Sequence, residues 1–185
     1  MFRVYKMKGV VRIEPSDLEK GLEVAALMEL KKRFEGAYIK DLGLIIAIRN
    51  LKVSPEGYII MGDGATYHEV ELELLAYVPT INEIIEATVE NIAKHGAHIR
   101  VGPIDGLIHI SQISDEEAFF DPVRGAIVLR QSKRVLMKGD KVRARVTSVS
   151  GASAQRLPRM SLTMRQPYLG KLEWIEEYKS KKGGK

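Results

Sequence analysis

Residues 83–111 read EIIEATVENIAKHGAHIRVGPIDGLIHIS, and this stretch decides the fold of the second half of the chain. Its central segment alternates two kinds of side chain, apolar Ala97, Ile99 and Val101 against polar His98 and Arg100. Because successive side chains of a strand point to opposite faces, the alternation predicts a strand with a buried apolar face and an exposed basic face. Glycines stand where the chain must turn, and they divide the stretch into three predicted short strands.

Two later segments repeat this alternation. Residues 141–149, KVRARVTSV, set apolar Val142, Ala144 and Val146 against basic Lys141, Arg143 and Arg145. Residues 159–165, RMSLTMR, set apolar Met160, Leu162 and Met164 against Arg159, Ser161, Thr163 and Arg165. Strands that share one apolar and one largely basic face predict an all-β barrel of five strands.

The barrel is expected to carry an insertion and a C-terminal helix. Residues 126–130 and 134–137 predict a hairpin closed over residues 131–133. After the fifth strand the apolar spacing becomes helical, with Leu172, Ile175 and Tyr178 on one face and Trp174 beside them. This spacing predicts a short helix, followed by a frayed basic tail.

The first half of the chain predicts an α+β domain that opens with a strand over residues 2–13. Ser16 and Glu19 form the S-x-x-E pattern of a capping box at the start of a helix. Leu18, Leu22, Ala25, Ala26, Leu30 and Phe34 fall near one helical face. Gly36 then suits a left-handed cap, so a single helix is expected to end near Glu35.

Further strands are expected over residues 43–53, 57–61 and 69–78. Ser54, Pro55, Glu56 and Gly57 are residue types that favour tight turns, so the first two of these strands are expected to form a hairpin. Pro79 marks the expected boundary between a domain of residues 1–78 and one of residues 79–185.

Charge is distributed unevenly along the chain. Residues 1–78 carry eleven Lys or Arg against twelve Asp or Glu, a net charge of −1, whereas residues 79–185 carry eighteen against twelve, a net charge of +6. Eleven basic residues, including Arg156, lie between Phe119 and Arg165, against Asp121 and Asp140 only. A basic field of this kind attracts a polyanion, so the second domain is predicted to bind nucleic acid.

The composition excludes several kinds of site. The chain has no cysteine and four histidines, which excludes disulfides and thiolate metal sites. On a strand, the odd spacing of His95 and His98 is expected to point them to opposite faces, so neither a metal site nor a cofactor is predicted. Glu69, Glu71 and Glu73 alternate on one strand face and are interpreted as solvated.

No catalytic arrangement and no membrane span are predicted. The glycine-rich MGDGATYH of residues 61–68 lacks the lysine of a phosphate-binding loop, so Gly62 and Gly64 are interpreted as permitting close backbone packing. No apolar run is long enough to cross a bilayer, and Met1 leads into a charged strand instead of a signal peptide. A cytoplasmic protein without a membrane partner is expected.

The segment KHGAHIRVGPIDGLIHISQIS, residues 94–114, resembles the S1 type of oligonucleotide-binding (OB) fold. In that family the positions of His95 and His98 are usually aromatic; an imidazole can still stack on a base, with a smaller hydrophobic area. The resemblance implies an RNA-binding face on the second and third strands. With the basic fourth strand, the implied RNA-binding residues are Lys94, His95, His98, Arg100, His109, Arg143 and Arg145.

The resemblance extends over the whole chain. Together with the opening strand and helix, three segments carry it: DLGLIIAI (41–48), GDGATYHEVELELLAYVP (62–79) and SLTMRQPYLGKLEWIEE (161–177). They are similar to the archaeal DNA-directed RNA polymerase stalk subunits of the E-prime, or subunit seven, family. The resemblance implies a truncated ribonucleoprotein-like fold for residues 1–78 and an S1 barrel after it.

This family also implies partners and a role. A non-catalytic stalk subunit of this kind forms a heterodimer with the F subunit of RNA polymerase, docks on the core RNA polymerase, binds nascent single-stranded RNA and assists transcription initiation. The docking tip is placed at two connections taken together, namely Asp41, Leu42, Gly43, Gly62, Asp63 and Gly64. The near-neutral charge of residues 1–78 fits a protein partner better than a polyanion.

Two other functions explain part of the sequence. A free-standing S1-type RNA-binding translation factor would account for the barrel and its charge, but it leaves the first domain unused. A ribonuclease or exosome component with the same barrel would need catalytic carboxylates elsewhere or an exosome core partner. Stable co-purification with a small helical partner would favour the stalk subunit over the translation factor, and metal-dependent RNA cleavage by the isolated chain would support the ribonuclease or exosome component.

Overall fold

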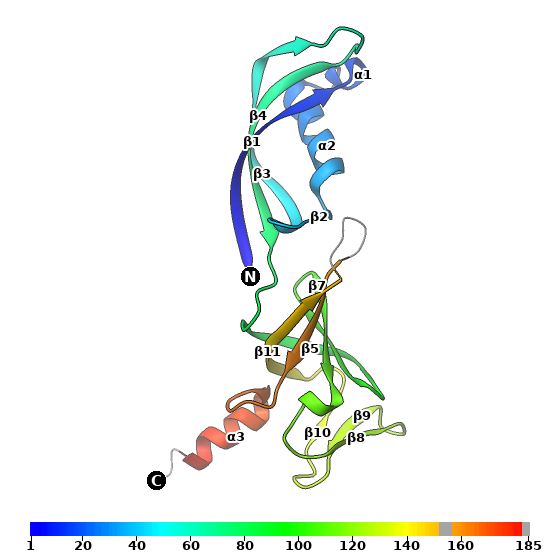
Figure 1. Ribbon diagram of the computed structural model, residues 1–185, viewed down its shortest axis with the longest axis vertical. Coiled ribbons are helices and arrows are strands. Elements are labelled where there is room, and N and C mark those ends of the chain that lie inside the picture. The colour runs from blue at the N-terminus through cyan, green and yellow to red at the C-terminus, as the bar shows by residue number, and fades with distance from the viewer. Residues whose placement is uncertain (152–156, 183–185) are drawn as a thin grey trace. The chain divides into compact units, whose positions relative to one another are not determined.

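The computed structural model describes residues 1–151 and 157–182. It divides into two compact units, the first ending at Val78 and the second beginning at Pro79, and each unit is described separately (Figure 1). Residues 152–156 and 183–185, which include Arg156 and part of the expected basic tail, lie outside the described residues. Among the residues described, no helix is long and apolar enough to cross a membrane.

Unit 1 is a curved antiparallel sheet with one face covered by helix. Its elements are β1 (Phe2–Ile13), α1 (Pro15–Leu18), α2 (Leu22–Phe34), β2 (Tyr38–Ile39), β3 (Gly43–Ile59) and β4 (Thr66–Tyr77). The strand order is β1-β4-β3-β2, and α2 lies along the sheet (Figure 1). The core joins Ala25, Ala26 and Leu30 of α2 to alternate residues of β1 and β4. The α+β prediction and the apolar helix face are therefore confirmed.

The prediction of one helix from a capping box is wrong. Glu14 is the N-cap of α1 and makes no side-chain cap, so Ser16 and Glu19 do not form the expected box. The chain then breaks at Gly21, whose φ of 95° is incompatible with a helix, and α2 begins at the next residue. Glycine adopts this left-handed conformation without steric cost, so it divides the expected helix in two.

The predicted hairpin at residues 54–57 is also wrong, because β3 runs through it as one strand. β3 pairs antiparallel with β4 throughout, and irregularities in register between Val53 and Gly57 absorb the extra residues. The buried His68 of β4 fixes this region, since its Nδ1 lies 3.0 Å from the carbonyl oxygen of Ser54. The turn-forming residue types therefore make a bulge in place of a turn.

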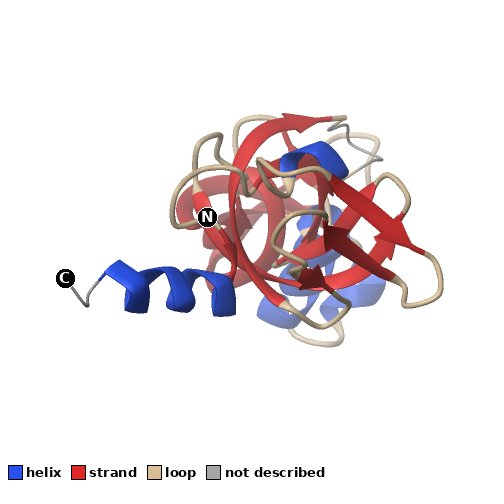
Figure 2. Cartoon of the chain, turned by 90° about the horizontal axis from the view of Figure 1, so that it is seen from below, coloured by secondary structure: helices blue, strands red, loops and turns tan. Residues whose placement is uncertain are grey.

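Unit 2 is a closed five-stranded barrel with an inserted small sheet. Its elements are β5 (Ile84–Ala93), β6 (Gly96–Val101), β7 (Ile104–His109), η1 (Ile110–Gln112), β8 (Ala118–Asp121), β9 (Ala126–Leu129), β10 (Val135–Leu136), β11 (Lys141–Ser150), β12 (Arg159–Thr163), β13 (Gly170–Lys171) and α3 (Leu172–Lys182). The order β12-β7-β6-β5-β11 closes through pairing of β12 with β11. Figure 2 shows the curved barrel strands and α3 leading to the C-terminus. The predicted all-β barrel and terminal helix are confirmed.

The predicted inward faces are also confirmed. All nine apolar residues named for the three alternating segments are buried, at 5 % exposure or less. Thr163 departs from the pattern, because it lies in the polar phase of β12 and is buried as well. Two short strands were not predicted: β8 adds a third strand to the expected hairpin, and β13 adds an edge to β11. Strands of two to four residues are too short to show periodicity.

Candidate RNA-facing surface and docking loops

The outward face of β6 carries His98 and Arg100. His98 lies opposite Asn91 of β5 and Leu107 of β7. Arg100 lies opposite Thr88 and Asp105 on the same two strands, and it is exposed. The structure therefore places both residues on one outward face, as the period-two pattern predicted.

Three histidines gather at one corner of this face, and one expectation about them is wrong. His95 and His98 do not diverge, since their Nε2 atoms are 2.9 Å apart and their rings meet edge to face at 5.1 Å. His95 belongs to the turn before β6, so strand alternation does not govern it. His109 lies opposite Gly96, and its Nδ1 is 2.8 Å from the hydroxyl of Ser111.

This histidine corner, with Lys94 beside His95, can offer several hydrogen-bonding groups to an anion. In the His95–His98 contact one ring nitrogen donates and the other accepts. Among the residues that the structure describes, no group of three or more His, Cys, Asp or Glu side chains is arranged to hold a metal ion.

Acidic residues on β5 neutralise the two most prominent arginines of the face. The Nε of Arg100 lies 2.9 Å from Glu90 Oε1, and the Nη2 of Arg143 lies 2.6 Å from Glu86 Oε1. Sequence reasoning missed these pairs, because the basic run of residues 119–165 contains neither acid. The arginines are thus less available to phosphate than the charge count suggests.

Arg143 and Arg145 lie apart from the histidine corner. Both belong to β11, which pairs with β5, so β5 separates them from His98 and Arg100 on β6. Arg145 is half-buried, and its Nε is buried with no hydrogen-bond partner within residues 1–151 and 157–182. The predicted RNA-binding set therefore falls into two groups of cations, one on each side of β5.

Lys171 is a buried charged residue that sequence reasoning missed. It is 8 % exposed, and its Nζ lies 3.0 Å from Asp140 Oδ1 and 2.8 Å from Glu173 Oε2. Burial alone would lower the pKa of Lys171, but hydrogen bonds to the two carboxylates outweigh it, so the pKa is raised. This ion pair joins β13 and the start of α3 to the loop before β11. Its role is structural.

The two predicted docking connections lie at opposite ends of the unit 1 sheet. Residues 41–43 lead into β3 near its pairing with Tyr77, whereas residues 62–64 follow the other end of β3, where Ile59 pairs with Thr66 (Figure 1). β4 spans the interval from Thr66 to Tyr77, about 36 Å at about 3.3 Å per residue. A hairpin at residues 54–57 would have turned the chain back toward Gly43; the continuous β3 instead carries residues 62–64 to the other end of the sheet.

Gly43 has a structural role that its predicted docking role did not include. It is buried at a φ of 84°, and a Cβ atom there would lie 2.5 Å from the carbonyl oxygen of Tyr77. Any larger residue therefore forces the sheet apart at this point. Asp41 is exposed beside it, and Leu42 packs partly against the core.

Asp63 holds the connection of residues 60–65 to the sheet. Its carboxylate accepts hydrogen bonds from Arg12 Nε and Nη2, both at 2.8 Å, from Tyr67 Oη at 2.7 Å and from the Ala65 amide at 3.1 Å. These bonds, that from Arg12 first, lower the pKa of Asp63 far below its ordinary value of 3.8. The bond to Asp63 likewise raises the pKa of Arg12. Asp63 is thus an internal clamp.

The glycines beside Asp63 leave open space around them. A Cβ atom added at Gly62 or Gly64 would meet nothing within 4 Å, so the interpretation that they permit close packing is wrong. The neighbouring apolar side chains are instead exposed, Ile59 at 68 %, Ile60 at 46 % and Met61 at 101 %. We call residues 58–64, which are the end of β3 and the turn after it, the distal loop. Its exposed apolar residues were not predicted from the sequence.

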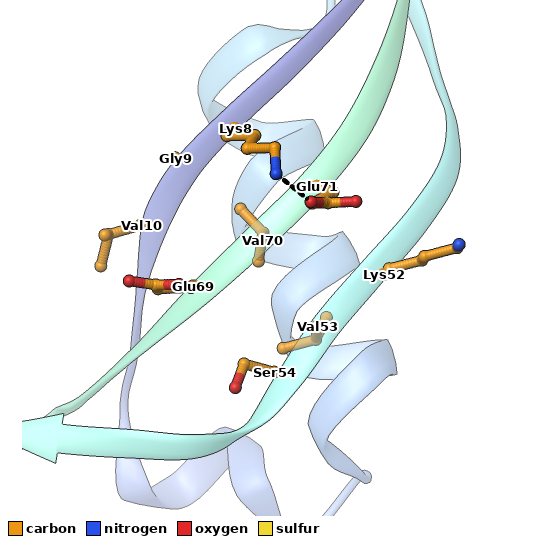
Figure 3. Close-up of a pocket in the computed structure, with 9 residues that line it drawn as sticks. All are labelled: Lys8, Gly9, Val10, Lys52, Val53, Ser54, Glu69, Val70 and Glu71. Carbon is orange, nitrogen blue, oxygen red and sulfur yellow. Dashed lines mark ion pairs between the residues drawn. The ribbon is translucent and has the colours of Figure 1, made fainter.

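An open groove of about 580 Å³ crosses the unit 1 sheet (Figure 3). The Lys8 ammonium pairs with Glu71 across it, which lowers the pKa of Glu71 and raises that of Lys8. Glu69 lies further along β4. Glu69 and Glu71 are exposed, which confirms that they are solvated. Glu73 is half-buried and accepts a hydrogen bond from Asn50 Nδ2 at 2.7 Å, so its interpretation as solvated is wrong. The groove carries both signs of charge and no cluster that suggests catalysis.

Comparison with known proteins accounts for both units. Residues 8–64 match the SHS2 domain found in the N terminus of Rpb7p/Rpc25p/MJ0397, and residues 78–154 match the S1 RNA binding domain. The DNA-directed RNA polymerase subunit Rpo7 of Saccharolobus shibatae is 50 % identical over 179 residues, covering 97 % of this chain and 99 % of that protein. That of Sulfolobus acidocaldarius is 47 % identical over 177 residues, covering 96 % of each chain.

A more distant relative also matches over nearly the whole length of both chains. The DNA-directed RNA polymerase III subunit RPC8 of Bos taurus is 24 % identical over 200 residues, covering 94 % of this chain and 98 % of that protein. An SHS2 domain followed by an S1 barrel thus defines a two-domain class of DNA-directed RNA polymerase subunit. At 50 % identity over nearly its whole length, the chain belongs to the Rpo7 family. The resemblance inferred from the sequence is confirmed.

Proposed function

We propose that this chain is the non-catalytic stalk subunit of an archaeal DNA-directed RNA polymerase, pairing with the F subunit of that enzyme and assisting transcription initiation. The observation that carries the proposal is the union of a polymerase-type SHS2 domain and an S1 barrel in one chain that matches Rpo7 over 97 % of its length. A free-standing translation factor or exosome component would give unit 1 no role.

Unit 1 is proposed to dock on the core enzyme through the distal loop. Neighbouring apolar side chains that are exposed together are typical of an interaction site. Ile59, Ile60 and Met61 fit that description, whereas the connection at residues 41–43 ends in a buried glycine. Gly62, Asp63 and Gly64 therefore remain docking candidates as the frame of the loop, and Asp41 and Leu42 remain a separate candidate.

Unit 2 is proposed to contact nascent single-stranded RNA weakly. Its match to the S1 RNA binding domain supports the contact, and the absence of Phe, Tyr and Trp from residues 79–118 argues against strong stacking on β5–β7. The cations without an ion pair among the described residues are Lys94, Lys133, Lys138, Lys141, Arg145, Arg159 and Lys179. RNA binding should therefore fall steeply with salt.

Recovery of polymerase subunits on the tagged chain tests this function. Wild-type chain should recover the F subunit and the core enzyme from archaeal extract, and Ile59→Ala with Met61→Ala should lose the core enzyme while keeping the F subunit. Met28→Ala is the matched control, because Met28 is 49 % exposed on α2 at a distance from the loop. Loss of the core with Asp41→Ala and not with the loop variant would move docking to the other end of the sheet. Failure of wild type to recover any polymerase subunit would refute the stalk assignment.

A further inference from the structure

A cleft of about 300 Å³ lies in unit 2, where the chain before α3 and α3 itself meet η1 and β9. Three of the five aromatic residues in residues 79–185 line it, namely Tyr168, Trp174 and Tyr178. Both tyrosines and Trp174 lie beyond the matched family ranges, which end at residue 154. The family descriptions therefore assign no role to this aromatic cleft.

Two exposed tyrosine rings stand at its mouth. Tyr168 and Tyr178 meet edge to face at 5.7 Å and are 47 % and 45 % exposed. Tyr168 has a φ of 63°, a left-handed backbone conformation that is uncommon for a bulky residue. Such a conformation persists only where the surroundings enforce it, and it is concentrated at ligand sites. The turn thus holds the Tyr168 ring at the opening.

The charged groups of the cleft are balanced. Arg134 Nη2 lies 3.0 Å from Glu177 Oε2, and its guanidinium sits 5.7 Å from the centre of the Trp174 ring. Arg165 Nε lies 2.9 Å from Asp115 Oδ1. With each cation paired, the cleft has little net attraction for phosphate. It offers instead aromatic faces beside adjacent donors and acceptors, which suits the flat, hydrogen-bonding surface of a nucleobase.

We propose that the aromatic cleft takes one base of single-stranded RNA, stacked on the exposed tyrosine pair. The inference rests on the proposed function, in which unit 2 contacts RNA. The outward face of β5–β7 has no Phe, Tyr or Trp and offers only the smaller histidine rings, so the tyrosine rings of the cleft are the larger stacking surface in the unit. The cleft volume of about 300 Å³ is at the small end of the range of small-molecule sites, which suits a single planar group. RNA bound at the basic face by charge would then be held at a second point by stacking.

Trp174 reports on the cleft directly, because it is the one tryptophan of the chain. The full chain is titrated with an oligoadenylate of about twelve nucleotides and with an abasic ribose-phosphate oligomer of the same length. Oligoadenylate should quench the fluorescence emission of Trp174, and the RNA concentration at half-maximal quenching should equal that at half-maximal filter binding. The abasic oligomer should bind about 5- to 150-fold more weakly without quenching, which corresponds to one stacked base. Because stacking is uncharged, this ratio should be the same at low and high salt.

Variants of the tyrosines separate stacking from folding. Tyr178→Ala removes one ring, and Tyr168→Asn removes the other with a residue that tolerates the left-handed backbone. Both should bind oligoadenylate about as weakly as wild type binds the abasic oligomer, and both should bind that oligomer normally. Phe119→Ala, which removes an aromatic ring that is 47 % exposed on β8 of the same unit, is the matched control and should behave as wild type.

Three outcomes would overturn the proposal, and each would lead to a different conclusion. If oligoadenylate binds wild type and both variants equally and leaves Trp174 emission unchanged, the cleft is not the site, although unit 2 still contacts RNA. If neither oligomer binds wild type, the RNA role in the proposed function fails together with the cleft. If the F subunit changes Trp174 emission and RNA does not, the cleft is a protein-binding site.

Discussion

Removing two acidic residues from the barrel face should strengthen RNA binding. Glu86 and Glu90 pair with Arg143 and Arg100, whose side chains are 29 % and 63 % exposed. Glu86→Gln with Glu90→Gln keeps the size of both side chains and releases both arginines toward solvent. Surface pairs of this kind contribute about 0–1 kcal/mol each to stability, so the double variant should remain folded.

The expected gain in RNA affinity comes from counterion release. The wild-type chain, neutralising about three to five phosphates, should show a logarithmic salt slope between about −2 and −3.5. Each freed arginine adds about −0.7 to that slope, so two add about −1.4. At about 0.1 M salt this is about a 25-fold gain in affinity, which shrinks to about 5-fold near 0.3 M.

Filter binding of single-stranded RNA over a series of salt concentrations measures both quantities. The control variant is Glu56→Gln with Glu176→Gln, which removes the same charge but releases no arginine, since neither acid forms an ion pair among the described residues. Equal gains in the two double variants would show that net charge acts and the pairs do not. Unchanged affinity and slope in Glu86→Gln with Glu90→Gln would refute the role of these arginines.

Three further predictions concern single sites. His98→Ala with Arg100→Ala should weaken RNA binding without lowering the melting temperature, because both residues face outward; unchanged affinity, or loss of the melting transition, would remove them from the site. Because the pKa of Asp63 is lowered in the folded protein, ionised Asp63 stabilises the fold at pH values above 3.8, and this stabilisation is lost as the pH falls through the lowered pKa. Between about pH 5 and about pH 2, the melting temperature of wild type should therefore fall more than that of Asp63→Asn. Equal falls would mean that the clamp adds nothing. Lys171→Met should cost about 1–3 kcal/mol in denaturant unfolding, because it leaves the half-buried Asp140 with only the Met137 amide as a partner, and a cost below about 0.5 kcal/mol would contradict that account.

Periodicity predicted the core of this protein well, since burial repeats with the strand. The inward residues of β6, β11 and β12 and the apolar face of α2 follow from spacing alone. Periodicity does not say where a strand ends. Ser54, Pro55 and Gly57 have the composition of a turn, but long-range pairing with β4 and the buried His68 keep the chain extended. In this segment, pairing with β4 therefore outweighs the local preference of the residues for a turn.

Contacts between strands explain most errors about the candidate site. Whether Arg143 is free depends on the register that places Glu86 of β5 opposite it, and a single sequence does not give that register. The meeting of His95 and His98 depends in the same way on the shape of a turn. Charge counted along the chain therefore overstated the basic face, because the neutralising acids come from a strand outside the basic run.

The clamp at Asp63 gives the distal loop a physical basis for docking. Exposed apolar side chains on a mobile loop lose conformational freedom when they bind, and that loss weakens association. Here Asp63 ties the loop to Arg12 of β1 and to Tyr67 of β4, and Tyr67 in turn stacks on Tyr58 with ring centres 5.5 Å apart. The loop is therefore held by both neighbouring strands before any partner arrives. Its glycines leave open space around this frame, so Ile59 and Met61 can be buried by a partner without rearrangement of unit 1.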